Sequence, residues 1–206
     1  METLGSRIMH LVIANQMANE DFITDKKSFL LGGIAPDAVS PKELSHFFVG
    51  EGSDYSRSIE YNSFFEKYRA SNQKDYILGY YTHLIADDLW LKGFYLPWLK
   101  NRMENDPFVF SLYHNDFRLL NGKLLDYYGI SAEELEGLEK CEALVDLQEV
   151  TIKNVKEFIP YVMYDMNYEE SDLEESLKIF TFEQIIGYIE TSVEKATLYI
   201  KSLEML

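Results

Sequence analysis

Residues 74–101 read KDYILGYYTHLIADDLWLKGFYLPWLKN and are the longest segment that we expect to be helical. Apolar side chains recur at helical spacing through this segment, and Pro97 is expected to kink the helix or to limit its regular part. His83 and Asp87 lie four residues apart within it. Their side chains therefore point the same way, about 6 Å apart at Cβ, and both can reach one cation.

The surroundings expected for this pair are largely apolar. Four aromatic residues share its side of the helix: Tyr76, Tyr80, Trp90 and Phe94. A carboxylate and an imidazole in such a frame are costly unless they are paired or bind a metal. Taken alone, the motif is short, and a hydrogen-bonded His–Asp pair that links helices is its simpler interpretation.

Helical spacing continues along most of the chain, which has only 5 Pro and 11 Gly but 15 Tyr and 13 Phe. Few helix breakers and many large side chains predict helices packed through aromatic residues. We expect helices over residues 6–20, 26–31, 58–71, 74–101, 107–128, 140–148, 152–166, 171–179 and 181–205, and a capped helix start at 131–134. Residues 32–37 predict a tight bend, residues 38–57 an irregular loop, and no segment reads as a convincing strand.

The expected fold is therefore all-α: a multi-helix bundle with a metal site in its core and extra C-terminal helices packed on it. Every histidine lies before residue 130. We therefore divide one domain into a metal-binding helical core, residues 1–130, and a C-terminal helical extension, residues 131–206. The apolar residues of the last helix could equally form a homo-oligomer contact.

The composition excludes several classes of protein. Of the 206 residues, 19 are Lys or Arg and 35 are Asp or Glu, so the formal net charge is −16. A chain this acidic lacks the broad basic surface of a nucleic-acid-binding protein, and anionic membranes should repel it. The single cysteine excludes an intramolecular disulfide and a Cys-rich zinc finger. No signal peptide or membrane-spanning run is visible, so we expect a cytoplasmic protein without stable membrane insertion.

The histidines make a joint case for a metal site, although each alone is more often a core or surface residue. All four lie in the first 114 residues, each in a separate expected segment. A helical bundle can project such residues from several elements into one interior site. Imidazoles with carboxylates suit Zn²⁺, with Fe, Mn or Ni as competitors. The expected ligands are His10, Asp37, His46, His83, Asp87 and His114.

Four segments resemble the zinc-dependent phospholipase C family in order and in approximate spacing. They are GSRIMH at 5–10, GIAPD at 33–37, SHF at 45–47 and GYYTHLIAD at 79–87. The likeness covers about residues 5–90, with a weaker extension to His114. It implies an all-helical phosphodiesterase with a multinuclear zinc cluster.

The resemblance also implies a role for each ligand. Asp37, His46, His83 and Asp87 match the residues of one metal site, and Asp87 would bridge to a neighbouring ion that His10 also binds. Asp37 would orient the attacking water or take its proton.

The family's further site uses two histidines and a glutamate. Only His114 has a counterpart there, and Arg118 stands where an acid would follow it. We therefore expect one or two ions rather than a full cluster.

The resulting hypothesis is metal-assisted hydrolysis of a small anionic phosphoester or a lipid headgroup. Two divalent ions would outweigh the two carboxylates, so the pocket would be locally cationic inside an acidic protein. Two alternatives stay open. One is a catalytically degenerate helical protein that binds metal or a partner. The other is a nucleotide phosphohydrolase of the helical His-Asp type, which uses adjacent His and Asp rather than the spacing found here.

Overall fold

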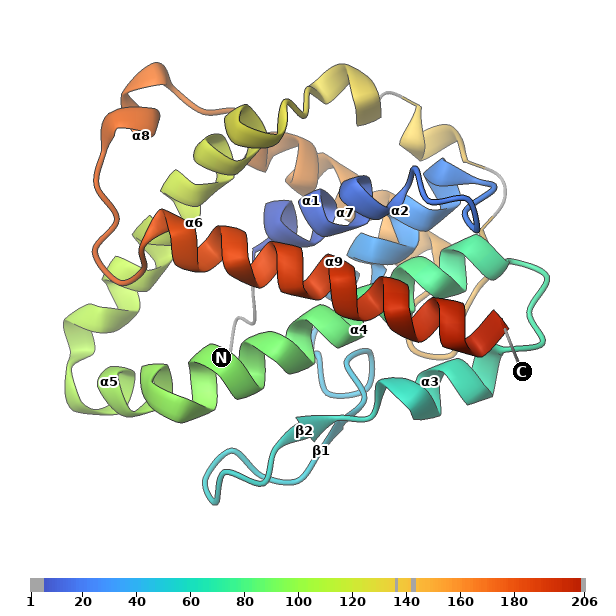
Figure 1. Cartoon of the computed structure of the whole chain (residues 1–206), viewed down its shortest axis with the longest axis horizontal. Coiled ribbons are helices and arrows are strands. Elements are labelled where there is room, and N and C mark those ends of the chain that lie inside the picture. The colour runs from blue at the N-terminus through green and yellow to red at the C-terminus, as the bar shows by residue number, and fades with distance from the viewer. Residues whose placement is uncertain (1–5, 136, 142–143, 205–206) are drawn as a thin grey trace.

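Helix α4 (Lys74–Trp90) runs through the interior of the computed structural model, which describes residues 6–135, 137–141 and 144–204 (Figure 1). Every residue of α4 from Asp75 to Asp88 is buried. Four helices pack against it: α1 (Arg7–Met17), α2 (Lys26–Ile34), α3 (Tyr61–Tyr68) and α9 (Phe182–Glu204). The chain is 68% helix and 2% strand, which confirms the expected all-α class.

The remaining elements surround this core. A 3₁₀ turn (Ala35–Ala38) follows α2, and a wide π-helical segment (Leu91–Leu99) links α4 to α5 (Lys100–Asn105). The later elements are α6 (Pro107–Tyr128), 3₁₀ turns at Ala132–Leu135 and Leu138–Lys140, α7 (Ile152–Asp165) and α8 (Glu170–Glu174). The π-helical segment contains Pro97, which has no N–H to donate, so the regular helix ends before it.

Side-chain caps explain where most helices begin. Ser6 accepts a hydrogen bond from the backbone N–H of Met9 at the start of α1, and Asp25 accepts one from Ser28 at the start of α2. Asp106 caps α6 in front of a proline at its first position. These residue types satisfy donors that a helix N-terminus leaves free, so the starts were readable from the sequence.

Helices α2 and α4 approach each other unusually closely. A Cβ added to Gly79 of α4 would lie 2.0 Å from the carbonyl oxygen of Phe29, and one added to Gly32 of α2 would lie 2.1 Å from that of Tyr76. Only glycine permits such contact between backbones. The bend expected over residues 32–37 is shorter than predicted, because Gly32 and Gly33 are helical and the bend follows in the 3₁₀ turn.

Replacement of Gly79 by alanine should separate α2 from α4. The added methyl group meets backbone atoms, which cannot rotate away, so we expect a loss of about 1–3 kcal/mol of stability, or about 2–4 °C in Tm for each kcal/mol. The control is Gly187→Ala in α9, where the new Cβ has no heavy atom within 4 Å. Thermal unfolding followed by circular dichroism compares the two. Equal Tm values would contradict the tight contact.

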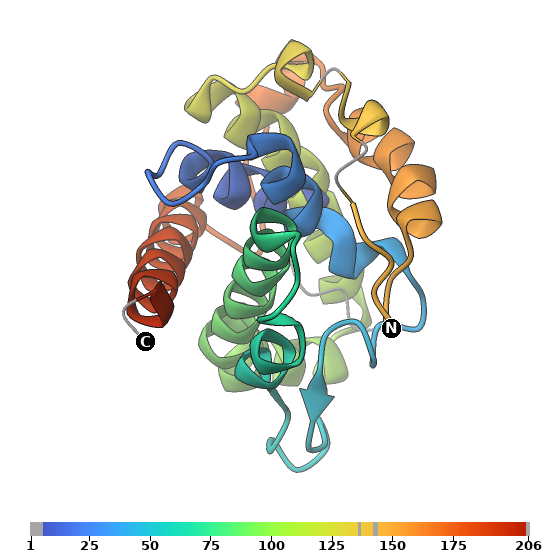
Figure 2. The same ribbon diagram turned by 90° about the vertical axis from the view of Figure 1, so that its right-hand side faces the viewer.

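The sequence analysis missed one small sheet. Strand β1 (Phe48–Val49) pairs antiparallel with β2 (Ser58–Ile59), so the loop is not wholly irregular and α3 starts later than residue 58. Strands of two residues are too short to produce an alternating pattern. The hairpin extends away from the helices at the bottom of Figures 1 and 2.

The expected helix over 140–148 was wrong in the part that the structure describes, since residues 144–150 form no helix. The one expected over 171–179 is confirmed only in its first turn, because α8 spans Glu170–Glu174 and ends there. Beyond it, the buried carboxylate of Asp116 accepts hydrogen bonds from the backbone N–H groups of Lys178, Ile179 and Phe180. Those N–H groups are therefore unavailable to a helix. Residues 142–143 lie outside the described residues.

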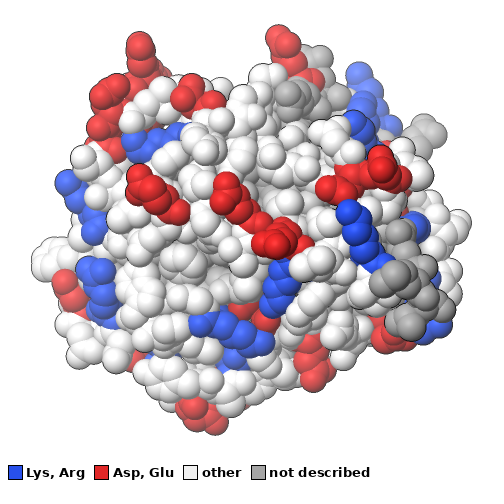
Figure 3. Space-filling model, in the orientation of Figure 1, with Lys and Arg blue, Asp and Glu red and all other residues white. Residues whose placement is uncertain are grey.

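The C-terminal region covers the core. Helix α9 packs against α1 and α4, and α7 packs against α1 and the turn Ala35–Ala38. On the face shown in Figure 3, acidic and basic side chains are interspersed. Within the described residues, no helix is both long and apolar enough to cross a membrane.

Candidate metal centre

Five of the six expected ligands meet in the interior. His10 comes from α1, Asp37 from the 3₁₀ turn after α2, His46 from the following loop, and His83 and Asp87 from α4. At least 98% of the surface of each histidine and of Asp87 is buried, and the side chain of Asp37 is 6% exposed. Residues separated by up to 77 positions in the sequence therefore share one buried cluster.

Asp87 lies at the centre of the cluster. Its Oδ1 is 3.1 Å from His10 Nε2, while its Oδ2 is 3.1 Å from His46 Nε2 and 3.4 Å from His83 Nε2. Asp37 Oδ1 lies 3.4 Å from the same nitrogen of His46. The two oxygens of Asp87 thus face two different groups of ligand atoms. Such an arrangement suits a carboxylate that bridges two neighbouring cations.

Backbone carbonyls orient two of the imidazoles. Nδ1 of His83 lies 2.8 Å from the carbonyl oxygen of Gly33, and Nδ1 of His46 lies 3.2 Å from that of Lys42. Because a carbonyl can only accept, we assign the N–H of His83 to Nδ1. Nδ1 of His46 also lies 2.9 Å from Ser45 Oγ, which can donate or accept. In the neutral ring, Nε2 of His83 then directs its lone pair towards Oδ2 of Asp87, 3.4 Å away. A cation between these two atoms turns their repulsion into coordination.

Unpaired polar atoms also fit a metal ion. Both ring nitrogens of His10 and both carboxylate oxygens of Asp87 are buried without a hydrogen-bond partner. The ring of His10 instead stacks on that of His83 with centroids 3.7 Å apart. Buried polar atoms without partners are rare and costly. Two groups of three ligand atoms have the spacing of a metal site: His10, His83 and Asp87, and Asp37, His46 and His83.

Charge interactions keep the carboxylates ionised. Burial alone would raise the pKa of Asp37, but the ammonium of Lys42 and a hydrogen bond from His46 hold it well below its usual value. The same opposition between burial and the neighbouring imidazoles holds the pKa of Asp87 well below its usual value. Ionised carboxylates are the form that binds a cation.

Two of the three histidines of the cluster, His83 and His46, have pKa values shifted in opposite directions. Burial and the adjacent His10 lower the pKa of His83 to about 4, so His83 is neutral at pH 7. Burial would also lower the pKa of His46, but the adjacent carboxylates of Asp37 and Asp87 raise it from its usual value. His83 is therefore ready to coordinate at neutral pH, whereas protons compete for His46.

The cluster adjoins a cavity of about 360 Å³ between α1, α6 and α7. Asp37 lies in its wall, together with three cationic side chains: Arg7, Lys42 and Arg118. Lys42 also forms an ion pair with Asp37. A small anionic molecule in this cavity would contact both the candidate ligands and these cations.

The sixth expected ligand, His114, lies apart from the other five. It projects from α6 into the cavity wall, where its ring packs edge-on against Phe110 and Tyr113, and it belongs to neither ligand group found in the described residues. Helix α6 thus supplies cavity-lining residues and, among the described residues, no ligand atom to either group. Burial lowers the pKa of His114 below its usual value.

Two further acids that could have completed another metal site have structural partners instead. Asp88 forms ion pairs with Lys92 and Lys195, while Asp116 caps the segment after α8 as described above.

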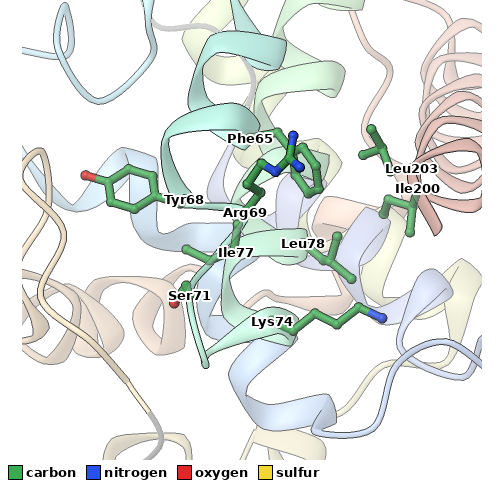
Figure 4. Close-up of a pocket in the computed structure, with 9 residues that line it drawn as sticks. All are labelled: Phe65, Tyr68, Arg69, Ser71, Lys74, Ile77, Leu78, Ile200 and Leu203. Carbon is green, nitrogen blue, oxygen red and sulfur yellow. The ribbon is translucent and has the colours of Figure 1, made fainter. Parts of the chain in front are cut away.

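A second cavity, of about 480 Å³, lies between α3, α4 and α9 (Figure 4). Its wall is mostly apolar, with Ile77, Leu78, Ile200 and Leu203 beside Arg69 and Lys74. No imidazole or carboxylate is among its described lining residues. Of these two cavities, the one beside Asp37 is the one whose described wall contains candidate metal ligands.

Comparison of the chain with protein-family models, with curated proteins and with solved structures found no match.

The sequence analysis did not assign a role to the three cations of the cavity. Each lies three or four residues from a histidine: Arg7 before His10, Lys42 before His46, and Arg118 after His114. On a helix this spacing places two side chains on one face, and that signal was available for two of the three.

Proposed function

We propose that this chain is a metal-dependent phosphoester hydrolase that resembles zinc-dependent phospholipase C. The observation that carries the proposal is the buried His–Asp cluster with unpaired ligand atoms, adjoining a cavity lined by cations. Zinc is the proposed metal, because imidazole and carboxylate are its ligands in hydrolytic sites. One or two ions are proposed, with Asp87 between them.

The residues divide into two groups by role. One ion would be held by His46, His83, Asp37 and Oδ2 of Asp87. The other would be held by His10 and Oδ1 of Asp87. When bound, a divalent cation supplies Lewis acidity, which lowers the pKa of water to about 7 and polarises phosphoryl oxygens. The carbonyl of Gly33 fixes the ring of His83, as outer-shell partners do in metal sites.

Asp37 is the proposed catalytic residue. It lies in the cavity wall and is ionised, so it can accept a hydrogen bond from a water in the cavity and orient it towards a substrate phosphoryl group. Lys42 lies beside it and would be close to the negative charge that develops on the phosphoryl oxygens.

Metal content and hydrolysis together test the proposal. Protein expressed without a His tag should contain one or two equivalents of zinc by mass spectrometry and should hydrolyse p-nitrophenyl phosphate or its bis ester. His83→Ala should lose both properties, because it removes a ligand. His114→Ala is the matched control and should retain the metal. Wild-type protein with substoichiometric metal, even after incubation with zinc, would refute the proposal. Stoichiometric zinc without hydrolysis would instead favour the degenerate metal-binding alternative.

A further inference from the structure

Part of the wall of the cavity beside the cluster has no role in the proposed hydrolysis. Arg7 at the start of α1 and Arg118 on α6 line it from different elements. Lys42, from the loop that follows the 3₁₀ turn, also lines it and pairs with Asp37. Asp37 and Asp165 are the lining acids. Three cations and two acids line this wall, and Asp172 and Glu175 also lie against Arg118. Two guanidinium groups that reach one cavity from different elements can bind an anionic group through several N–H donors.

Both guanidinium groups are held in place from the C-terminal region. Arg7 pairs with Asp165 of α7 and lies over the rings of Phe158 and Tyr161. Arg118 pairs with Asp172 of α8 at 2.6 Å through Nη1, and its Nη2 lies 3.7 Å from Glu175. Its Nε and Nη2 also donate to Asn115 Oδ1 at 3.4 Å. A guanidinium has five N–H donors, so N–H groups of both arginines remain for a ligand. Asp165 and Asp172 are therefore positioning residues for the two arginines.

Exposure of these groups is compatible with ligand access. The side chains of Arg7 and Arg118 are 38% and 52% exposed. Asn121, on the next turn of α6, contributes a buried Oδ1 without a hydrogen-bond donor to the same wall. This oxygen can accept a hydrogen bond from a ligand hydroxyl.

From this arrangement we infer that the substrate carries a second anionic group beyond its scissile phosphoryl, and that Arg7 and Arg118 bind that group. The inference rests on the proposed function, since it places the scissile phosphoryl at the His–Asp cluster. It narrows the substrate to small, doubly anionic phosphoesters. A zwitterionic headgroup would bring a quaternary ammonium against two guanidinium groups, and like charges disfavour that complex.

The test uses two probes that differ in one group. 3-Phosphoglycerate and glycerol 3-phosphate have the same phosphate and the same central hydroxyl, but the first has a carboxylate where the second has a hydroxymethyl group. Isothermal titration calorimetry on zinc-loaded protein should give an affinity about tenfold higher for 3-phosphoglycerate, because charge-assisted hydrogen bonds are the stronger ones. Phosphocholine should bind more weakly than either probe.

Variants then assign the preference to the arginines. Arg118→Gln and Arg7→Gln should each remove most of the tenfold preference and leave the zinc content unchanged. The matched control is Arg69→Gln, which removes an arginine that pairs with Glu66 and lines the other cavity (Figure 4). It should preserve the preference. Circular dichroism shows whether each variant is folded, and Arg118, the more exposed of the two, provides the result if Arg7→Gln unfolds.

The possible failures are distinguishable. The inference would be overturned if wild-type protein bound 3-phosphoglycerate and glycerol 3-phosphate with equal affinity. It would also be overturned if all three variants lost the preference for 3-phosphoglycerate equally. In either case, zinc content and hydrolysis would still support the proposed function. Absence of zinc from the wild-type protein would overturn the proposed function itself. A preference that survives in both Arg7→Gln and Arg118→Gln would show that other groups bind the second anion and would refute the assignment.

Discussion

Asp87→Asn should lower zinc affinity more than a hundredfold and abolish hydrolysis, while the neighbouring Asp88→Asn retains both. The amide is isosteric with the carboxylate but carries no charge, and one of its two atoms becomes a donor that cannot coordinate. Both oxygens of Asp87 face histidine nitrogens at 3.1–3.4 Å, so the change affects every ligand group at once. Changes to outer-shell partners alone cost about 10–100-fold in affinity, so loss of a ligand should exceed that range.

Asp88 makes the comparison informative because it has the same chemistry, helix and burial. Its carboxylate instead meets Lys92 and Lys195, outside the cluster. Asp88→Asn should therefore cost stability without changing the zinc content. Equilibrium dialysis with metal analysis gives the affinities, and thermal unfolding gives the stability of each variant. Equal zinc affinities for the two variants would show that Asp87 is not a zinc ligand.

The spacing of His83 and Asp87 shows what sequence reasoning could establish. Four residues on one helix place two side chains on one face whatever the tertiary structure, and the structure brings them within 3.4 Å. The capped starts of α1, α2 and α6 were readable for the same reason, since a cap depends on residues three apart or fewer. Local geometry was therefore predictable from local sequence.

The contacts of His46 show where such reasoning ends. Its loop has no periodicity that predicts where the ring points. The expectation of a shared cation and the resemblance to the phospholipase C family placed it beside Asp37. His114 was assigned by the same two arguments, yet it belongs to neither ligand group in the described residues. The prediction of a helix in the segment after α8 was wrong for a similar reason. The backbone N–H groups of that segment donate hydrogen bonds to Asp116, which is more than sixty residues away. Long-range partners decided these positions, and the sequence of each segment does not contain them.

Acidification should release zinc before it unfolds the protein. Histidine must lose its proton to bind a metal, so zinc competes with protons for His46. The carboxylates of Asp37 and Asp87 raise the pKa of His46 from its usual value, so protons compete with zinc at a higher pH than for an ordinary histidine. We expect the affinity for zinc to fall between pH 7.5 and 5 from this group, by up to about tenfold per pH unit. His83, with a pKa of about 4, adds to the loss only below pH 5.

Thermal stability reports this release directly. Zinc at about a hundred times its Kd stabilises the folded chain by about 2.7 kcal/mol, which corresponds to about 5–10 °C in Tm for a protein of this size. That increment should be present at pH 7.5, shrink towards pH 5, and vanish with a chelator at either pH. Asp87→Asn should show no increment at any pH, because it lacks the central ligand. A zinc-dependent Tm increment that did not change between pH 7.5 and 5, or that persisted in Asp87→Asn, would mean that the ion stabilises the chain from outside this cluster.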